Sequence, residues 1–292
     1  LLFKEQMDEL GTRGSLGTIR AFDRQLVMNQ YERFFNPENM VVSVAGAFDF
    51  DEVCEHLEGS LGQLPAGRAV PEVIRGEVLH NRARSVYRYT ERSPVVDLAL
   101  SYQAYSLADE RFADLLAVSH ILGGGLGSRL FMQVREELGL VYQIGSQPMV
   151  YSDTGALNVS LNVESANLAR SVEASLDVLG EVREEGISEE ELESYKESVR
   201  CGMDILCDRP ARLAEYLARQ ELLLPSEKVL TPEEFVAQQE ALTTESLREV
   251  IDDIFVRENA NLAVVGPFTE DQQKRLAGLF PAEEASFEDN GE

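Results

Sequence analysis

A glycine-rich segment, Gly123-Gly124-Gly125-Leu126-Gly127-Ser128, is the part of this sequence whose residue types most directly suggest binding. Residues without a Cβ leave their backbone N–H and C=O groups exposed, so this segment could approach a bound chain closely. The same glycines could instead form a tight helix–helix turn with positive φ angles. A phosphate-binding P-loop is excluded, because no Gly-Lys-Ser/Thr ending follows and the GxGxxG spacing fails at Ser128. The binding and the turn interpretations both stay open at this stage.

The histidines of this chain do not form a recognisable metal-binding motif. The three histidines, His56, His80 and His120, are scattered, and neither HExxH nor HxxEH occurs. No zinc site can therefore be drawn from this sequence. His120 lies at the end of an expected helix, where a packing or capping role is favoured over a ligand role.

Arg135 and Tyr142 carry strong hydrogen-bond donors, a guanidinium and a phenol. From the residues alone, Arg135 is a surface helix residue beside Glu136 and Glu137. Tyr142 is, on the same grounds, a strand aromatic that packs on a sheet.

The elements that would position these residues alternate between strands and helices. Strict alternation of apolar side chains predicts half-buried strands, as at Leu157, Val159, Leu161 and Val163. In chain order we expect a strand at 96–102, a helix around 115–122, a helix at 130–138 ended by Gly139, strands at 141–145 and 157–163, a helix at 165–185, and a further helix opening with the capping box Ser188-x-x-Glu191. Strands in one sheet with helices against a face indicate an α+β fold.

Residues 20–48 repeat at 240–268, at a constant offset of 220 without gaps. Each copy predicts a helix, then a turn at Glu-Asn, then a short buried strand ended by glycine. The second strand is Leu262–Val265, and its expected counterpart is a buried strand at Val41–Ala45.

The repeat predicts a duplicated two-layer domain of sheet plus helices whose first copy is truncated. About 150 residues precede the repeated unit in the second copy, whereas only 19 precede it in the first. We therefore expect residues 1–63 to be the remnant of an N-terminal domain, 64–87 to be a linker, 88–282 to be a complete C-terminal domain, and 283–292 to be an acidic tail.

The amino-acid composition of the 292-residue chain disfavours some classes of binding partner. With 26 Lys plus Arg against 52 Asp plus Glu, the formal net charge is −26. This excess disfavours nucleic acid, whose phosphates are bound by Lys and Arg, and it disfavours anionic membranes. Three cysteines, Cys54, Cys201 and Cys207, form no CxxC clip and are expected to be buried small hydrophobes. They favour a cytoplasmic location and are also compatible with the periplasm.

The stretch from Leu122 to Tyr142 resembles the C-terminal domain signature of the M16 (pitrilysin-like, insulinase-type) zinc metallopeptidases. The shared features are the glycine-rich loop, Ser-Arg-Leu-Phe at 128–131, an Arg-Glu step, and a Tyr seven residues after the Arg. Where relatives often have Lys after Arg-Glu, this chain has Glu137. The resemblance covers the chain from about residue 16 onward, and it implies two sister α+β domains that face each other.

The resemblance implies roles that the residues alone do not. Arg135 and Tyr142 match the Arg and Tyr that reach the substrate and stabilise its oxyanion. The glycine loop, with Gly123, Gly124, Gly125, Gly127 and Ser128, would bind an extended peptide by strand addition. The zinc cofactor of the family sits on a His-x-x-Glu-His motif of the first domain, which would precede Leu1 or lie on a partner subunit.

Two functional hypotheses follow. In the first, the chain is the C-terminal part of a zinc endopeptidase that acts on peptides, and by itself it is inactive. The zinc-bearing half would then be the missing N-terminal half or a partner subunit. A dimer is compatible with this hypothesis. In the second, it is a non-catalytic scaffold or partner subunit of the same fold. The presence of both Arg135 and Tyr142 favours the first.

Overall fold

The computed structural model describes residues 16–68 and 83–280, in two compact units. Among these residues, the first unit comprises 83–200 and 234–280, and the second comprises 16–68 and 201–233. In the described part of the chain no helix is long and apolar enough to cross a membrane.

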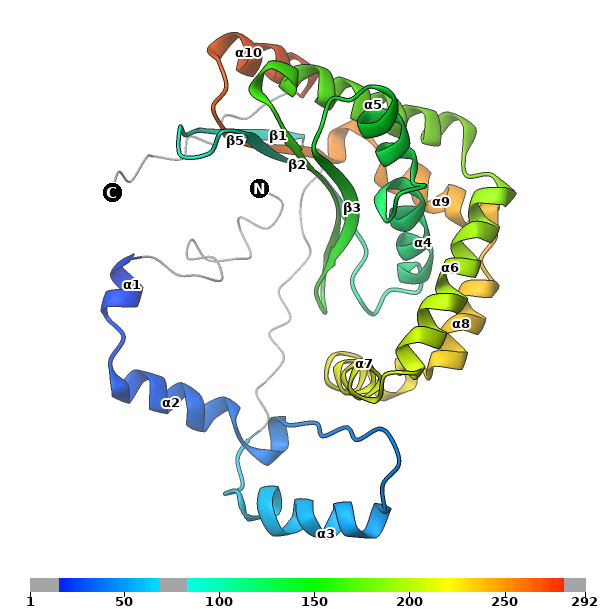
Figure 1. The fold of residues 1–292 in the computed structure, drawn as a ribbon. Helices are drawn as coiled ribbons and strands as arrows, with labels where there is room; N and C mark the ends of the chain where they lie inside the picture. The colour runs from blue at the N-terminus through cyan, green and yellow to red at the C-terminus, as the bar shows by residue number, and fades with distance from the viewer. Residues whose placement is uncertain (1–15, 69–82, 281–292) are drawn as a thin grey trace. The chain divides into compact units, whose positions relative to one another are not determined.

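The first unit is built on a five-stranded sheet with the order β1-β5-β2-β4-β3 (Figure 1). Its strands are β1 (Arg84–Tyr89), β2 (Val96–Ala104), β3 (Gln143–Val150), β4 (Gly155–Val163) and β5 (Ala260–Gly266). β1 pairs with β5 in parallel, and the other neighbours are antiparallel. β1 begins within the range expected as a linker, four residues before the expected domain start at 88. The sheet leaves β3 and β1 at its two edges.

Side-chain alternation divides the sheet into an apolar and a polar face. Leu98, Leu100 and Tyr102 of β2 are buried and lie in register with apolar residues of β4 and β5. The opposite face carries hydrogen-bonded polar pairs, such as Ser101 Oγ with Asn158 Oδ1 at 2.6 Å. The predicted alternation in β2 and β4 is confirmed.

Helices cover the apolar face, which makes this unit two-layered (Figure 1). The helices of this unit are α4 (Phe112–Gly123), a π-helix (Phe131–Glu137), α5 (Leu168–Glu185), α9 (Thr244–Ile254) and α10 (Glu270–Leu279), with short 3₁₀ turns at Ser165–Asn167 and Arg257–Asn259. α6 (Glu189–Cys207) and α8 (Pro232–Glu240) each contribute residues to both units. The α+β fold expected from the sequence is confirmed.

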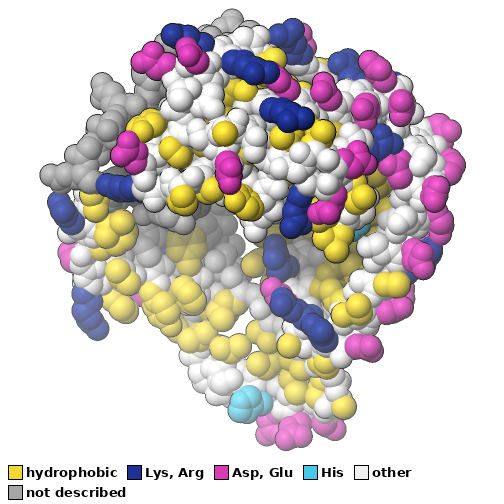
Figure 2. All heavy atoms as spheres, turned by 45° about the horizontal axis from the view of Figure 1, so that its top comes forward, with side chains coloured by type: hydrophobic (Ala, Val, Ile, Leu, Met, Phe, Trp, Pro, Cys, Tyr) yellow, Lys and Arg dark blue, Asp and Glu magenta, His cyan; other side chains and the backbone are white. Residues whose placement is uncertain are grey.

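The second unit is helical in its described part. It contains α1 (Leu16–Arg20), α2 (Arg24–Phe34), α3 (Phe50–Ser60) and α7 (Pro210–Leu223), with 3₁₀ turns at Pro37–Asn39, Leu61–Gln63 and Ser226–Lys228. Many of its hydrophobic side chains are exposed, including Phe22, Phe35 and Phe50, and exposed hydrophobic groups stand out in yellow in Figure 2.

The structure reproduces the sequence repeat at the same offset of 220 residues. α2 and α9 begin and end at matching positions, as do the 3₁₀ turns at Pro37–Asn39 and Arg257–Asn259. Both helices are capped by a side-chain oxygen one residue before their start. Asp23 accepts from Leu26 N at 2.7 Å, and Thr243 accepts from Ser246 N at 3.1 Å.

The expectation of a buried strand at Val41–Ala45 is wrong. This segment forms neither helix nor strand and pairs with no strand in the described residues, and Val42 and Val44 are exposed. Its counterpart β5 is inserted between β1 and β2, and its Leu262 and Val264 are fully buried. A strand is defined by its neighbour, so the same pattern without a neighbour stays unpaired.

The cysteine expectation is also wrong. Cys201 and Cys207 are exposed and Cys54 is partly exposed, and all three are free thiols. Both exposed cysteines lie in the C-terminal part of α6, whereas the buried residues of that helix, Leu192 and Tyr195, lie in its first half. The capping box at the start of that helix is confirmed, because Ser188 N donates to Glu191 Oε2 at 2.9 Å and Glu191 N donates to Ser188 Oγ at 3.3 Å.

Candidate functional site

The first half of the glycine loop is packed against its own scaffold. A Cβ on Gly123 would lie 2.3 Å from the backbone nitrogen of Ser146 in β3, and one on Gly124 would lie 2.8 Å from Nδ1 of His120. No glycine of this loop has a positive φ angle, so the positive-φ turn interpretation is wrong. A side chain is excluded at Gly123 by the close approach of α4 to β3, and at Gly124 by His120 of α4 itself.

The second half of the loop is open. A Cβ on Gly125 or Gly127 would meet no atom within 4 Å, and Leu126 between them is 74% exposed. The segment is closed by Ser128, whose Oγ donates to Gly125 O at 2.7 Å. Gly125 and Gly127 are therefore the glycines of the loop with open space around them, although the Gly125 carbonyl already accepts from Ser128.

This open half borders a cavity of about 620 Å³ between the loop and α6. His120 and Tyr195 form its inner wall, with ring centroids 5.3 Å apart. Burial lowers the pKa of His120, which keeps its imidazole neutral at pH 7. Tyr195 donates to Gln239 Oε1 at 2.7 Å, which fixes the tyrosine ring.

Glu191, which lines the cavity, forms an ion pair with Arg129. Arg129 Nε lies 2.6 Å from Glu191 Oε1, and the same guanidinium donates to Gly186 O at 2.9 Å. Burial alone would raise the pKa of Glu191, but hydrogen bonds from Arg129 and Ser188 outweigh it and lower the pKa to about 2. The loop is thereby tied to the start of α6.

This ion pair should make stability depend on acid pH. Because the pKa of Glu191 is lower in the folded state, its stabilising contribution is complete above the unfolded value of 4.5 and is lost as pH falls toward about 2. Glu191→Gln should therefore flatten the fall in unfolding midpoint between these two values. Chemical denaturation at a series of pH values measures this, with the exposed Glu190→Gln as the matched control. Equal slopes for Glu191→Gln and the unaltered chain would contradict the assignment.

Arg135 lies in the π-helix, a rare conformation that is frequent at functional sites. The π spacing is shown by Leu138 N, which donates to Gln133 O, five residues earlier, at 3.1 Å. The Arg135 guanidinium lies over the Phe131 ring, 4.6 Å from its centroid, and 4.0 Å from Glu136. With 39% of its side chain exposed, Arg135 is held at the surface while its donors remain accessible.

Tyr142 directly precedes the edge strand β3 and is 58% exposed. Its hydroxyl donates to Glu164 Oε1 at 3.0 Å. This hydrogen bond raises the pKa of Tyr142 above its usual value, so the phenol stays protonated near neutral pH. The phenol has a single O–H to donate, and in this structure Glu164 accepts it.

The edge strand β3 connects the parts of this site. Gly123 packs on Ser146 within β3, Tyr142 directly precedes β3, and the π-helix that carries Arg135 contacts β3. In the described part of the chain, no hydrogen bond joins Arg135 to Tyr142. The structure thus places both residues and the loop around one strand without a direct bond between the two side chains.

Glu164 was not identified from the sequence. It lies 22 residues after Tyr142, and only the register of β3 with β4, in which Gln143 is opposite Asn162, brings the two together. The pairing could have been found from the sequence if the turn at Tyr151–Gly155 had been used to deduce the register of the β3–β4 hairpin.

The described residues do not fit a zinc ion. Within 16–68 and 83–280, no three His, Cys, Asp or Glu side chains are placed to hold a metal. His80, the remaining histidine, lies outside the described residues.

We expect that residues 1–292 alone bind no zinc tightly, because tetrahedral zinc sites need three or four such ligands. Elemental analysis after dialysis checks this. Stoichiometric zinc that is lost on mutating ligands within the chain would contradict it.

Comparisons with known proteins agree with the sequence signature. The model of the "Peptidase M16 inactive domain" matches residues 21–199, more than half of the chain. The "uncharacterized zinc protease YmxG" of Bacillus subtilis (strain 168) is 26% identical over 258 residues, covering 88% of this chain and 60% of the relative.

Solved structures show the same fold. A peptidase M16 inactive domain from Pseudomonas fluorescens superposes with a TM-score of 0.77 at 20% identity, covering 88% of this chain and 60% of the other. The first half of the periplasmic protease PqqL from Escherichia coli gives a TM-score of 0.67 at 20% identity, with coverage of 94% and 63%. This chain spans about 60% of the length of the YmxG relative. On the match of the family model over residues 21–199, the chain belongs to the peptidase M16 family.

Proposed function

We propose that this chain is the C-terminal part of a zinc-dependent endopeptidase acting on peptides. The observation that carries the proposal is the family match, together with relatives that are named zinc proteases and are longer than this chain. In this proposal the zinc ligands lie upstream or on a partner subunit, and the chain supplies groups that bind the substrate.

The exposed hydrophobic side chains in the first copy of the repeat support the proposal that the chain is part of a longer protein. Val27 is 56% exposed, whereas its counterpart Leu247 is fully buried in the first unit. Asn39 Nδ2 donates to Phe34 O, just as Asn259 Nδ2 donates to Ile254 O, but Asn259 also bonds both backbone groups of Gln103 in β2. The first copy thus keeps the local bonds and presents the surface on which a second sheet would be built.

The chemistry follows from the exposed donors around β3. An extended peptide would add to the edge of β3, with the backbone of Gly125 and Gly127 next to it. Arg135 and Tyr142 would donate hydrogen bonds to the scissile carbonyl and stabilise its tetrahedral oxyanion. Zinc, when bound, supplies the activation of the attacking water.

The second candidate function is a non-catalytic scaffold or partner subunit. The matching model is described as an inactive domain, which is compatible with a purely structural chain. A scaffold does not need exposed donors at Arg135 and Tyr142, and this favours the peptidase.

The deciding experiment joins the chain to its upstream sequence, or mixes it with a zinc-bearing partner subunit, and measures hydrolysis of a quenched-fluorescent peptide library. We expect cleavage that chelators abolish and that zinc restores. A complete, folded, zinc-loaded assembly that cleaves no member of the library would overturn the proposal in favour of the scaffold.

A further inference from the structure

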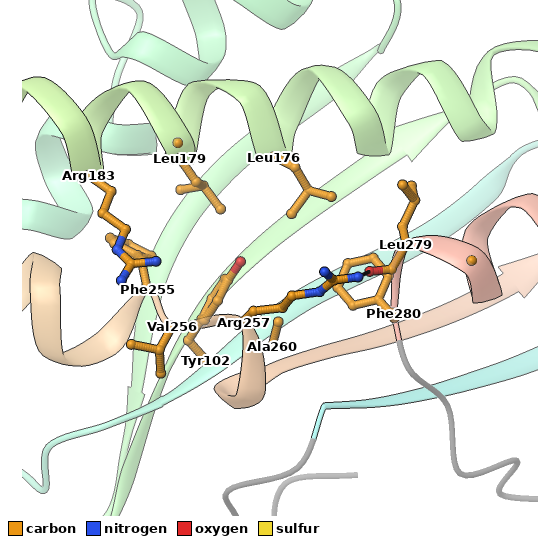
Figure 3. Close-up of a pocket in the computed structure, with 12 residues that line it drawn as sticks. Tyr102, Leu176, Leu179, Arg183, Phe255, Val256, Arg257, Ala260, Leu279 and Phe280 are labelled. Carbon is orange, nitrogen blue, oxygen red and sulfur yellow. Dashed lines mark hydrogen bonds between the residues drawn. The ribbon is translucent and has the colours of Figure 1, made fainter.

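A second cavity, of about 390 Å³, opens in the first unit between α5, α10 and the start of β5. Most of its wall is apolar, and Leu176, Leu179 and Phe255 are among the residues that line it (Figure 3). This volume lies toward the lower end of the range for small-molecule pockets. Among the described residues, the cavity shares no lining residue with the cavity beside the glycine loop, and neither Arg135 nor Tyr142 borders it.

The hydroxyl of Tyr102 in β2 faces this cavity without a partner. Tyr102 is only 4% exposed, and its ring packs edge-on against Phe255 with the two centroids 5.1 Å apart. Figure 3 shows its hydroxyl directed toward Leu176 and Leu179 of α5, whose side chains cannot accept a hydrogen bond. Within residues 16–68 and 83–280 this hydroxyl makes no hydrogen bond. Because buried polar groups are usually paired, an unpaired hydroxyl aimed into a cavity favours an acceptor that binds there.

This hydroxyl keeps its proton at neutral pH. Burial raises the pKa of Tyr102 above its usual value, because the charged phenolate is poorly solvated in the interior. A neutral phenol has one O–H to donate. An oxygen acceptor in the cavity would therefore satisfy it.

Two arginines set the charge of the cavity wall. Arg183 of α5 and Arg257 of the 3₁₀ turn line it, and no aspartate or glutamate is among the described lining residues, although the chain has 52 acidic and 26 basic residues. Arg183 has no hydrogen-bond or ion-pair partner in the described part of the chain. Arg257 donates to Leu279 O at 3.3 Å, which leaves its other N–H groups. Figure 3 shows the two guanidinium groups on either side of the Tyr102 hydroxyl. Guanidinium groups favour a carboxylate, which they can bind through two parallel hydrogen bonds.

Two glycines keep this cavity open. Gly180 of α5 and Gly278 of α10 both line it, and a Cβ at either position would meet no atom within 4 Å. Glycine inside a helix is less favourable than alanine, and no close packing contact requires it here. The absence of side chains at these two positions leaves room for a ligand.

We propose that this cavity binds a small carboxylic acid with an aromatic body. The ring of the ligand would pack on Leu179 and Phe255, since aromatic rings favour edge-to-face contacts with one another. Its carboxylate would accept hydrogen bonds from Tyr102 and Arg183. This binding does not depend on the peptidase activity.

Saturation-transfer difference NMR of the full chain tests the proposal, with 4-phenylbutyrate as the probe. We expect a dissociation constant of about 1 mM, as the usual binding efficiency of ligands of this size predicts. The uncharged 4-phenylbutyramide has the same ring and should bind about ten-fold more weakly, because it loses the charge-assisted hydrogen bonds.

Four variants locate the ligand. Gly180→Leu should abolish binding, because its side chain fills the cavity and favours the helix. Gly202→Leu is the matched control and should leave binding unchanged, since Gly202 is an exposed glycine of α6 with no neighbour within 4 Å. Arg183→Gln should weaken binding about ten-fold, and Tyr102→Phe about five-fold. Tyr102→Phe should not lower the unfolding midpoint of the free chain, because the hydroxyl that it removes has no partner there.

Three results would overturn the proposal. The first is the absence of saturation transfer at a probe concentration well above 1 mM. The second is equal affinity of the parent chain, Gly180→Leu and Arg183→Gln, which would place the probe on exposed hydrophobic side chains elsewhere. The third is equal affinity for the acid and the amide, which would show that the arginines do not recognise a carboxylate.

Discussion

Tyr142→Phe should lower kcat of the complete, zinc-loaded enzyme about 10²-fold or more, as the loss of one oxyanion donor does. This variant removes the exposed hydroxyl, whose single O–H is donated to Glu164 in this structure and would turn to the oxyanion in the transition state. KM should change little, because the hydrogen bond matters mainly once the oxyanion forms. Steady-state kinetics on a cleaved peptide measure both constants.

Two further measurements separate catalysis from packing. Arg135→Lys should also be costly, because a point charge cannot reproduce the planar guanidinium fork. Both variants should keep the unfolding midpoint of the parent, since both side chains are exposed. A near-normal kcat for Tyr142→Phe would remove the pair from the mechanism.

Leu247→Ala should cost about 2–5 kcal/mol of the free energy of unfolding, whereas Val27→Ala should change it by less than about 0.5 kcal/mol. The two positions are equivalent in the repeat, but Leu247 is fully buried and Val27 is 56% exposed. Removing a buried side chain leaves a cavity, and removing an exposed one leaves water. Denaturant titration of this chain measures the difference.

The same pair of variants tests whether the first copy is completed elsewhere. In the chain joined to its upstream sequence, Val27→Ala should become destabilising by an amount similar to that of other buried valine truncations. If its effect stays small in the longer protein, residues 20–48 do not form the second sheet-and-helix layer that the repeat implies.

Local patterns predicted most of the elements of this fold. Leu157 to Val163 alternate strictly and form β4, and Ser188 with Glu191 forms the expected cap, because these signals depend only on neighbours in sequence. The unpaired segment at Val41–Ala45 shows where prediction from local patterns fails. Its pattern matches that of β5, but only a neighbouring strand turns such a pattern into a buried one.

The site was less predictable than the fold. Resemblance pointed to Arg135 and Tyr142, and their surroundings depended on features without a sequence pattern. No spacing of side chains indicates a π-helix, and no local signal joins Tyr142 to Glu164. The glycine loop has a packed half and an open half. The sequence did not indicate this division, because the partner of Gly123, Ser146, comes from a strand that is distant in sequence.

The π-helix at Phe131–Glu137 also makes this region sensitive to chain length in an uncommon way. A deletion of one residue there would exchange five-residue for four-residue hydrogen-bond spacing and produce an ordinary α-helix. Each residue of an α-helix turns the chain by about 100°. A one-residue insertion or deletion in this segment would thus swing the guanidinium around the helix axis while Tyr142 stayed fixed to its strand. A change in length alone could therefore re-aim this arginine, with both Arg135 and Tyr142 still present in the sequence.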